Sequence, residues 1–418
     1  MTNKVIKPAF ENVTLTGDLD AKILAGGPMI AYSTPREVGI WVSTAKEARV
    51  RIAYYDEDAV EKVRVTAEIE TSREDAFTIL FRCDRVEPGR KYLYKLYING
   101  KTHKLPFERS FSTPPINDEI TSGPSSASIG SERMALLGAH AVDDVLYPPH
   151  TPIQKSDVIE RLIGQLQALD PTAMLWVGNS ILMRTADTSS KTGYDLRYGF
   201  ARNWKELRSL QATVPQYAAP GADDLGASAS NGWLELPEIA RLSFNRFWPV
   251  PHRNSSQDLS YSFTRSDVKV FVLDAFAYRN KKQRYGQNQI DWLMQGLEAN
   301  QNKRLRVVAL GEAFASSAYK AESKALLKRL RDAAKQGPIL LTAPGATATF
   351  WVEHAPGLAQ LVLGPFTRKP AQVGATNFKG KQIAEGNVYG MLSWSKEQAP
   401  TLHIYSPAGD TLMTHSFQ

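Results

Sequence analysis

The sequence predicts an α/β protein in which a small all-β domain precedes a larger, layered α/β domain. Three observations support this fold class. The chain of 418 residues is too long for a single small core. Its first quarter consists of short apolar runs separated by turn residues, whereas the later part alternates apolar strands with amphipathic helices. We therefore expect an N-terminal arm (1–22), a β-sandwich (23–115), a linker (116–133) and a layered domain (134–418).

The β-sandwich is predicted from strand-like runs between residues 26 and 113. They read VGIWVST, ARVRIAYYD, VRVTAEI, AFTILFRCD and KYLYKLYING, with turn residues between them. Asn99 and Gly100 end the last run, and this pair favours a two-residue turn between antiparallel strands. Strands of this length and spacing are typical of sandwiches of the immunoglobulin or fibronectin type III kind. The one cysteine, Cys83, ends an apolar strand, so we expect a buried structural thiol and no internal disulfide.

Residues 114–133 are rich in Pro, Gly and Ser, which indicates a linker. After them, strands are predicted from the runs MALLGAH, MLWVGNS, QYAAPGADD, KVFVLDAFAYR, LRVVALGEAF and PILLTAPG. Helical spacing of apolar residues predicts helices over 156–170, 203–214, 236–248, 288–300 and 320–336. The remaining C-terminal residues return to β hairpins. Because layered α/β folds bind ligands at the carboxyl ends of their strands, we expect site residues in the loops 138–144, 178–184, 219–226, 274–279, 311–314 and 343–349.

The composition excludes several classes of protein. Hydrophobic residues make up 43% and charged residues 22% of the chain, and no apolar run is long enough to cross a bilayer. Lys plus Arg exceed Asp plus Glu by 50 − 43 = +7, but the basic residues are scattered, so we expect no nucleic-acid partner. Residues 1–17 lack the basic start and apolar middle of a secretory signal. We therefore expect a cytoplasmic protein, or an exported one whose signal has been removed.

Several catalytic motifs are absent from the sequence. There is no Gly-x-Ser-x-Gly run of a serine hydrolase, no G-x-x-x-x-G-K-[ST] phosphate loop and no G-x-G-x-x-G after a strand. The 7 histidines include no H-x-H or H-x-x-x-H pair, a frequent spacing of histidine metal ligands. These absences exclude the commonest local signatures of hydrolase, nucleotide and zinc sites.

Beyond these local signatures, the ordered motifs of the chain resemble the PhoD-like alkaline phosphatases and phosphodiesterases of the calcineurin-like metallophosphoesterase superfamily. GGPMIAYSTPREVGIWVST and EPGRKYLYKLYING resemble the first and last strands of the family's N-terminal β-sandwich. The runs AMLWVGNSILMR, TVPQYAAPGADDLGASAS, FNRFW, VKVFVLDAFAYRN and NQIDWLMQGLEA follow its catalytic domain in order and spacing. The resemblance implies a metallophosphoesterase-like α/β/β/α sandwich. It also implies two divalent metals, such as Ca, Fe, Mn or Zn, which activate water and neutralise phosphate.

At the strand ends where the family places metal ligands, this chain carries other residues. The first strand end has His140 in place of the family's small or acidic motif, and Asp143 follows shortly after. The second has Asn179 where the family has a bridging aspartate, and a neutral amide cannot supply charge to two dications. At the third, Gly-Ala-Asp-Asp ends in Asp223 and Asp224, and the family's ligand and histidine are replaced.

The family's last motif is also replaced in this chain, while one family aspartate is retained. The family's last motif, Gly-Asp-x-His-His, is replaced by a Pro-Gly-Ala-Thr run that ends at Thr347. Asp274 matches a family aspartate and is expected to hold loop backbone, while Arg184 is expected near the pocket rim, where it could attract an anion. We expect no bound metal and no catalytic residue, only a vestigial pocket formed by His140, Asp143, Asn179, Arg184, Asp223, Asp224, Asp274 and Thr347.

Three hypotheses follow from the resemblance and its departures. The favoured one is a catalytically inactive PhoD-like pseudophosphatase, a binding or accessory subunit with a protein partner in the bacterial cell envelope, where family members are commonly exported. The alternative is an active phosphomonoesterase or phosphodiesterase with a site remodelled around His140, Asp143, Asp223 and Asp224. The third is metal-free binding of an anionic ligand in the vacated cleft.

Overall fold

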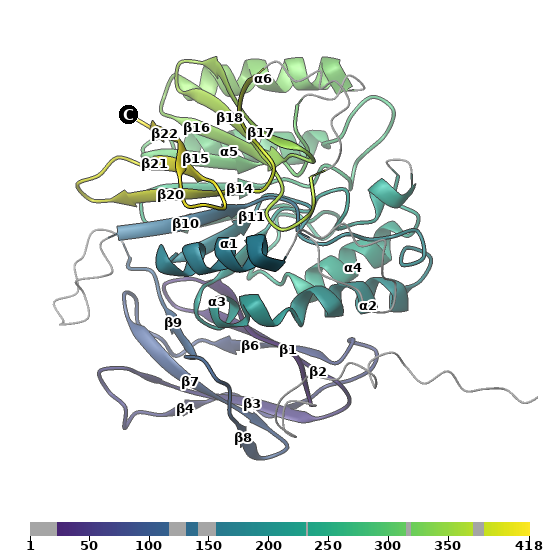
Figure 1. The fold of residues 1–418 in the computed structure, drawn as a ribbon, viewed down its shortest axis with the longest axis vertical. Helices are drawn as coiled ribbons and strands as arrows, with labels where there is room; N and C mark the ends of the chain where they lie inside the picture. Colours follow the sequence, from purple (N-terminus) through teal and green to yellow (C-terminus); the bar gives the residue numbers. More distant parts are fainter. Residues whose placement is uncertain (1–22, 117–130, 141–155, 231–232, 315–318, 371–379) are drawn as a thin grey trace, which may run out of the picture.

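The computed structural model describes residues 23–116, 131–140, 156–230, 233–314, 319–370 and 380–418. A β-sandwich lies at one end of the molecule, and two stacked sheets with helices outside them form the rest (Figure 1). The predicted arm lies outside the described residues, as does most of the predicted linker. The predicted order of an all-β part followed by a layered α/β part is confirmed.

The β-sandwich has two sheets whose facing side chains form one core. Strands β1, β2 and β6 form one sheet, and β3 and β7 form the centre of the other. The bounds are β1 Leu24–Ser33, β2 Val38–Thr44, β3 Arg49–Asp56, β4 Arg64–Val65, β5 Ile69–Glu70, β6 Thr78–Cys83, β7 Lys91–Ile98, β8 Lys101–His103 and β9 Ser110–Ser112. Asn99 and Gly100 form the predicted turn between β7 and β8, with positive φ angles of 50° and 77°. Cys83 is buried in the sandwich core, as predicted.

Strands β1 and β2 are buried on both faces, which explains why they read as continuous apolar runs. Ile30 and Ile40 belong to the sandwich core, whereas their neighbours Met29 and Trp41 belong to the core of the layered domain. Successive side chains of a strand point to opposite faces, so this sheet contributes to two cores. The Trp41 indole N–H also donates to the Arg246 carbonyl across the boundary, at 2.9 Å. The sandwich and the layered domain are therefore packed directly against each other.

The first sheet of the layered domain has the strand order β12-β11-β10-β20-β21-β22. Its strands are β10 Ser131–Leu137, β11 Ala173–Trp176, β12 Gln216–Ala218, β20 Tyr389–Ser395, β21 Thr401–Tyr405 and β22 Thr411–Ser416. β10, β11 and β12 run parallel, and β20 pairs with β10 in the antiparallel sense. β10 begins at Ser131, inside the segment predicted as a linker, because its polar first residues pair with β20 and Glu132 forms a buried ion pair with Arg265.

The second sheet has the order β13-β14-β15-β16-β18-β17-β19. Its strands are β13 Tyr261–Arg265, β14 Val268–Val272, β15 Leu305–Ala309, β16 Ile339–Pro344, β17 Ala348–Ala355, β18 Leu358–Leu363 and β19 Lys381–Glu385. The tail was predicted as hairpins, and β17 and β18 do form one. However, β18 also pairs with β16 in parallel, and the last three strands join the first sheet. The hydrophobic pattern identifies a strand but not the sheet that it enters.

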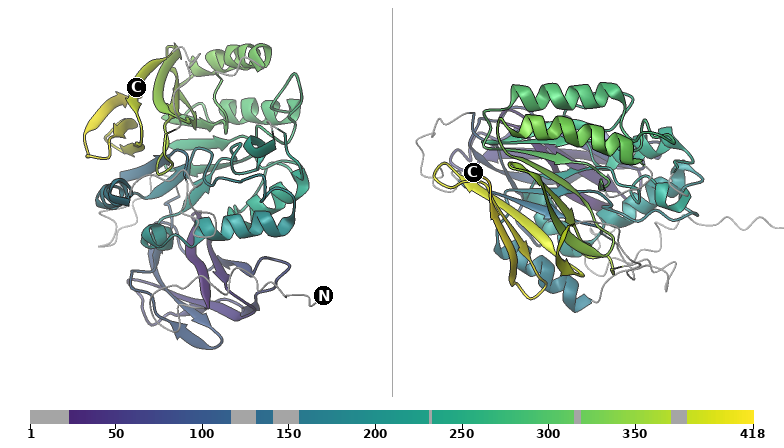
Figure 2. Two further views of the ribbon diagram at one scale, coloured as in Figure 1. Left: turned by 45° about the vertical axis from the view of Figure 1, so that its right-hand side comes forward. Right: turned by 90° about the horizontal axis from the view of Figure 1, so that it is seen from above.

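Helices cover the outer faces of the two sheets. Helices α5 and α6 lie over the second sheet, and α1 lies against the first (Figures 1 and 2). The bounds are α1 Ser156–Ala168, α2 Lys191–Arg202, α3 Arg208–Thr213, α4 Pro237–Phe247, α5 Gln287–Ala299 and α6 Lys320–Ala334, with the 3₁₀ turns η4 Lys205–Leu207 and η5 Ala227–Ser230. In the described part of the chain, no helix combines the length and the apolar character needed to span a membrane.

Two helices differ from the sequence prediction. α2 was not predicted, because its buried residues include Asp195, Arg197 and Arg202 in place of an apolar stripe. Its start is fixed by Ser190, whose side chain accepts a hydrogen bond from a backbone N–H of the first turn. The helix predicted over 203–214 is instead the 3₁₀ turn η4 followed by the short α3.

Candidate functional site

The loops at the carboxyl ends of β10, β11 and β12 meet in a group of side chains that we call the strand-end cluster. Its members are His140, Asn179, Asp223 and Asp224 from these loops and Arg368 from the loop after β18. The His140 backbone N–H donates to the Asn179 carbonyl at 2.9 Å. The Asp223 N–H donates to Asn179 Oδ1 at 3.0 Å. Hydrogen bonds thus join three loops that are far apart in the sequence.

Asn179 is the residue through which these loops are connected. Its backbone adopts the left-handed conformation, with φ of 57°, which asparagine tolerates better than most non-glycine residues. Gly221 packs so closely that a Cβ at this position would lie 2.3 Å from Asn179 Oδ1. The junction therefore requires glycine at 221, and the amide oxygen of Asn179 already has a protein partner.

The Asp224 carboxylate is fully buried and is surrounded by hydrogen-bond donors of the protein. Oδ1 accepts from the Ser180 hydroxyl at 2.6 Å and from the Ile181 N–H at 3.0 Å, and Oδ2 accepts from the Gly221 N–H at 2.7 Å. Burial raises the pKa of Asp224 to about 7, against the opposing effect of these donors. Both carboxylate oxygens are used to hold loop backbone.

Asp223 forms an ion pair with the Arg368 guanidinium. The Asp223 side chain is 5% exposed and the Arg368 side chain is 25% exposed, so the pair lies largely out of water. The loop that carries Arg368 is itself fixed, since the Phe366 N–H donates to the Ala139 carbonyl at 2.9 Å. A guanidinium stays charged at physiological pH, so a permanent positive charge lies among the strand ends.

His140 is buried between two tryptophans. Its ring centroid lies 5.3 Å from that of Trp176 and 4.6 Å from that of Trp204, and its Nδ1 lies 2.5 Å from the Thr367 hydroxyl. Burial and the charges of Arg202 and a second arginine of α2 lower the pKa of His140 to about 3. The ring is therefore neutral at physiological pH. Its Nε2 has no hydrogen-bond partner among the described residues.

Three of the other predicted site residues, Arg184, Thr347 and Asp274, have hydrogen-bond partners outside this cluster. Arg184 forms a bidentate pair with Asp187, in which Nε–Oδ2 and Nη2–Oδ1 are both 2.8 Å. Its charge is therefore balanced locally, which weakens the expected attraction for an anion. Thr347 is half-buried in the loop between β16 and β17, where its carbonyl accepts from the Gly386 N–H at 3.3 Å.

Asp274 lies at the end of β14 and holds the backbone of two loops. Its fully buried carboxylate accepts hydrogen bonds from the backbone N–H groups of Leu259, Phe276 and Ala277, at 3.0, 2.8 and 3.1 Å. Burial raises the pKa of this carboxyl group above its ordinary value. The last predicted member of the pocket, Asp143, lies outside the described residues.

The strand-end cluster does not fit a pair of divalent metal ions. Within the described ranges, no group of three or more His, Cys, Asp or Glu side chains could hold a metal. Asp223 and Asp224 are occupied by Arg368 and by three donors, respectively. The Nε2 of His140 has no partner among the described residues, but the neighbours of the ring in that part of the chain include indoles and arginines, with no carboxylate among its hydrogen-bond partners there. Hard dications require several anionic oxygen ligands, and these carboxylates are already engaged.

Sequence reasoning missed Arg368, which belongs to the cluster, and Ser180 and Thr367, which hydrogen-bond to members of it. Ser180 directly follows Asn179, so its position beside the site was available from the strand-end rule. Thr367 and Arg368 lie in the loop GPFTRKP after the apolar run LAQLVL. That run was read as a hairpin strand, but its parallel pairing with β16 places the following loop at the same edge as the cluster.

Comparison with known proteins relates this architecture to two phosphatases. No protein-family model matches the chain, and no curated protein has a similar sequence. PhoD matches its structure with a TM-score of 0.66 and 13% sequence identity, over 95% of this chain and 92% of PhoD. The purple acid phosphatase PPD1 from yellow lupin (Lupinus luteus) seeds matches with a TM-score of 0.63 and 14% identity, over 94% of this chain and 73% of that one. At these identities the likeness establishes the fold, and the chain has the PhoD-like metallophosphoesterase fold that its motifs predict.

Proposed function

We propose that this protein is a catalytically inactive pseudophosphatase with the PhoD-like fold, which acts as a binding or accessory subunit. The observation that carries the proposal is the ion pair between Arg368 and Asp223 at the strand ends. A positive partner stabilises a buried carboxylate, and Arg368 supplies one from within the chain. Asp223 therefore needs no bound metal to balance its charge.

The other contacts of the strand-end cluster support the same proposal. A dication at Asp224 would compete with the Ser180 hydroxyl and two backbone N–H groups for the carboxylate oxygens. Each buried donor left without an acceptor would cost about 1–3 kcal/mol. A dication beside Asp223 would also meet the charge of Arg368. The cluster is thus stabilised in a form that opposes metal binding.

The proposal is tested by assaying the purified full chain with bis(p-nitrophenyl) phosphate in the presence of Mn²⁺, Fe²⁺, Zn²⁺ or Ca²⁺. We expect the rate to equal that of the metal in buffer alone. The matched control is the His140→Ala variant, which should give the same background. Metal-dependent turnover by the natural chain that is abolished by His140→Ala would contradict inactivity.

The alternative function is a metal-dependent phosphomonoesterase or phosphodiesterase with a remodelled site. One observation favours it: His140 is held neutral, and its Nε2 has no partner among the residues that the structure describes. A neutral imidazole nitrogen of this kind is a suitable metal ligand. This alternative predicts the turnover that the favoured proposal excludes, so the same assay separates the two.

An anionic ligand is a further candidate for the same region. Arg202 is buried against the Trp248 ring, with Cζ 3.6 Å from the ring centroid, and its Nη2 has no partner in the described part of the chain. A bound anion would supply that partner. Phosphate and sulfated sugars should then raise the melting temperature, and Arg202→Met should remove the rise. Equal melting curves with and without these anions would exclude them as ligands.

We propose the bacterial cell envelope, periplasm or surface, as the place where this subunit meets a protein partner. The PhoD-like fold supports this location by analogy with that family. Fractionation of the native host should recover the chain with envelope markers. Recovery with cytoplasmic markers alone would contradict the location and leave the proposal of inactivity untouched.

A further inference from the structure

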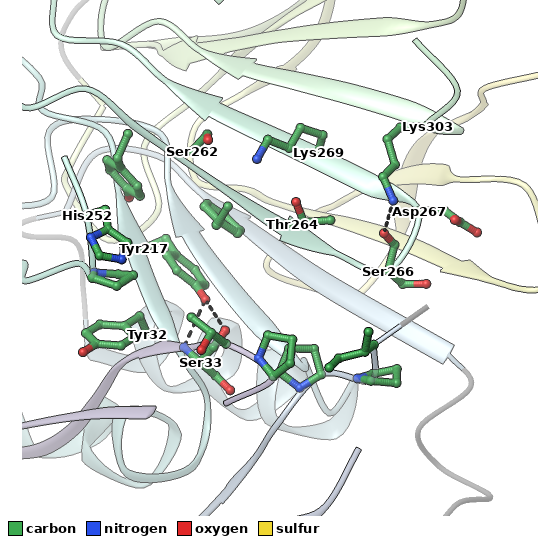
Figure 3. A pocket seen from close by; sticks show the side chains of 18 of the residues that line it. Tyr32, Ser33, Tyr217, His252, Ser262, Thr264, Ser266, Asp267, Lys269 and Lys303 are labelled. Atoms are coloured by element: carbon green, nitrogen blue, oxygen red, sulfur yellow. Dashed lines mark hydrogen bonds between the residues drawn. The ribbon is translucent and has the colours of Figure 1, made fainter. Parts of the chain in front are cut away.

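A pocket separate from the strand-end cluster runs along the outer strand of the second sheet. We call it the β13 groove: it lies between β13 and the sandwich residues 33–35 and 114–116 (Figure 3). Its volume is about 630 Å³, within the range of about 300–1,000 Å³ typical of ligand-binding pockets. The groove therefore lies where the β-sandwich and the layered domain meet.

In the part of the chain that the structure describes, strand β13 has one side free for hydrogen bonding. It is the terminal strand of its sheet there and pairs with β14. The turn after it has two residues, so the closing pair, Arg265 and Val268, is a hydrogen-bonded pair of the ladder. Hydrogen-bonded and non-hydrogen-bonded pairs then alternate along the strand. Ser262 and Thr264 belong to non-hydrogen-bonded pairs, so their peptide groups point away from β14. Neither residue has a hydrogen-bond partner on that side among the described residues.

One wall of the groove contains an aromatic stack that hydrogen bonds hold in place. The Phe263 ring stacks on Tyr217, with 3.7 Å between centroids and an angle of 7° between the planes. Tyr217 is fixed in turn, because its hydroxyl bonds to both the N–H and the carbonyl of Ser33, each at 3.2 Å. Pro114 and Pro115 line the facing side. Such walls retain the space for an added strand, which lies about 4.8 Å from the strand with which it pairs.

The described lining of the groove also carries more positive than negative charge, with Lys269 and Lys303 against Asp267. Lys269 lies on β14 beside Thr264, and within the described ranges no carboxylate pairs with it. Among the described residues, Lys303 donates to the Ser266 carbonyl at 3.1 Å, and Asp267 is the one acid among the described residues that line the groove. In Figure 3 the two lysines lie on the opposite side of the groove from Tyr32 and Ser33. Burial and the nearby charge of Lys303 lower the pKa of Lys269.

We propose that the β13 groove binds an extended, acidic polypeptide segment of a partner protein, which adds to the second sheet as a further strand on β13. Its backbone would pair with the outward peptide groups of Ser262 and Thr264, and an acidic side chain would reach Lys269. Addition of a strand to a free sheet edge is a known mode of peptide recognition, in which main-chain hydrogen bonds give affinity and side-chain pockets give specificity. The inference rests on the proposed function of a binding subunit and names the chemistry of its partner.

The experiment selects peptides from a random-sequence display library on the full chain, and then measures synthetic copies of the enriched peptides by fluorescence anisotropy. We expect enrichment of extended sequences that combine β-branched residues with Asp or Glu. Thr264→Pro removes the outward N–H without touching the ladder to β14, and should weaken binding about tenfold or more. Thr264→Ala keeps that N–H and should bind as the natural chain does. Melting curves of the two variants check that both are folded.

Charge is tested separately from backbone pairing. Lys269→Ala should weaken binding and reduce its salt dependence, whereas Lys381→Ala on β19, at the opposite edge of the same sheet, should change neither. Failure to enrich any peptide, or enriched peptides insensitive to both Thr264→Pro and Lys269→Ala, would overturn the proposal. Concentration-dependent self-association that Thr264→Pro abolishes would also overturn it, because a second copy of the chain would then be the occupant.

The phosphodiester assay on the same preparations keeps this inference separate from the proposed function. Peptide binding together with turnover would contradict inactivity alone. Neither binding nor turnover would contradict the β13 groove proposal alone. Turnover without binding would contradict both.

Discussion

The strand-end cluster and the β13 groove differ in how their polar groups are satisfied. In the cluster, Asp223, Asp224 and Asn179 all bond to the protein itself. In the groove, the outward peptide groups of Ser262 and Thr264 and the amine of Lys269 have no such partners in the described chain. Thr264 is exposed and Ser262 is half-buried, and the unpaired peptide groups of such an edge strand can pair with another chain. We therefore propose a structural role for the strand ends, where the fold would place catalysis, and a recognition role for the boundary between the two domains.

The largest expected effect is a loss of stability of the folded protein when a residue of the strand-end cluster is replaced. Asp224→Ala removes the acceptor of the Ser180 hydroxyl and of two buried N–H groups. We expect the free energy of unfolding in urea to fall by about 3–5 kcal/mol. Thr264→Ala in the groove is the control and should change it by less than about 0.5 kcal/mol. Equal effects of the two substitutions would remove the contrast between the regions.

The pH dependence of stability sharpens this prediction. The pKa of Asp224 is about 7 in the folded protein, against an ordinary value of 3.8. Its stabilising contribution to the free energy of unfolding is therefore complete below pH 4 and is lost as the pH rises to 7. His140 acts in the opposite sense, because its pKa falls from 6.5 to about 3, and its contribution is lost as the pH falls through that interval. In the natural chain the two contributions therefore partly cancel, and the free energy of unfolding changes less with pH than either residue alone would make it change.

Asp224→Asn separates the two contributions. The free energy of unfolding of the variant, minus that of the natural chain, should rise by an amount on the order of 2–4 kcal/mol between pH 4 and pH 7. Urea unfolding at several pH values measures this difference. A difference that stays flat across the interval would show that Asp224 ionises normally in the folded protein.

The outline of the fold could be predicted from the sequence, but the strand-end cluster could be predicted only in part. Runs such as MLWVGNS identify buried strands because a strand covered on both faces is apolar throughout, and the strand-end rule then identifies Asn179 and Asp224. α2 could not be predicted from its pattern, since it buries Arg197 and Arg202. The position of Arg368 beside the cluster depends on the pairing of β18 with β16. That pairing is a property of the whole sheet and leaves no local signal in the sequence.

A smaller loss of stability is expected when the positive charge of Arg368 is removed from the cluster. Arg368→Ala leaves the Asp223 carboxylate buried without its partner, and we expect a loss of about 2 kcal/mol in the free energy of unfolding. The loss is smaller than for Asp224 because the Arg368 side chain is partly exposed and water can replace part of the interaction. Arg368→Lys should retain some of the stability. A change below about 0.5 kcal/mol for Arg368→Ala would show that the pair contributes little.

The smallest effect on stability is expected in the groove. Lys269→Ala removes a charge that has no ion-pair partner in the described chain and that is repelled by Lys303. We expect the free energy of unfolding to stay within about 0.5 kcal/mol of that of the natural chain, or to rise slightly. A loss as large as that of Arg368→Ala would mean that Lys269 has a structural role, and the groove would then resemble the cluster.

The metal content of the full chain tests the central claim most directly. The chain is equilibrated with Mn²⁺, Fe²⁺, Zn²⁺ and Ca²⁺ in turn, freed of unbound metal by gel filtration and analysed by inductively coupled plasma mass spectrometry. Because Arg368 and protein donors already occupy the carboxylates, the account predicts far less than one ion per chain, and the same value for Asp223→Asn. About two ions per chain, lost on Asp223→Asn, would contradict it and would identify the strand-end cluster as a working dimetal centre.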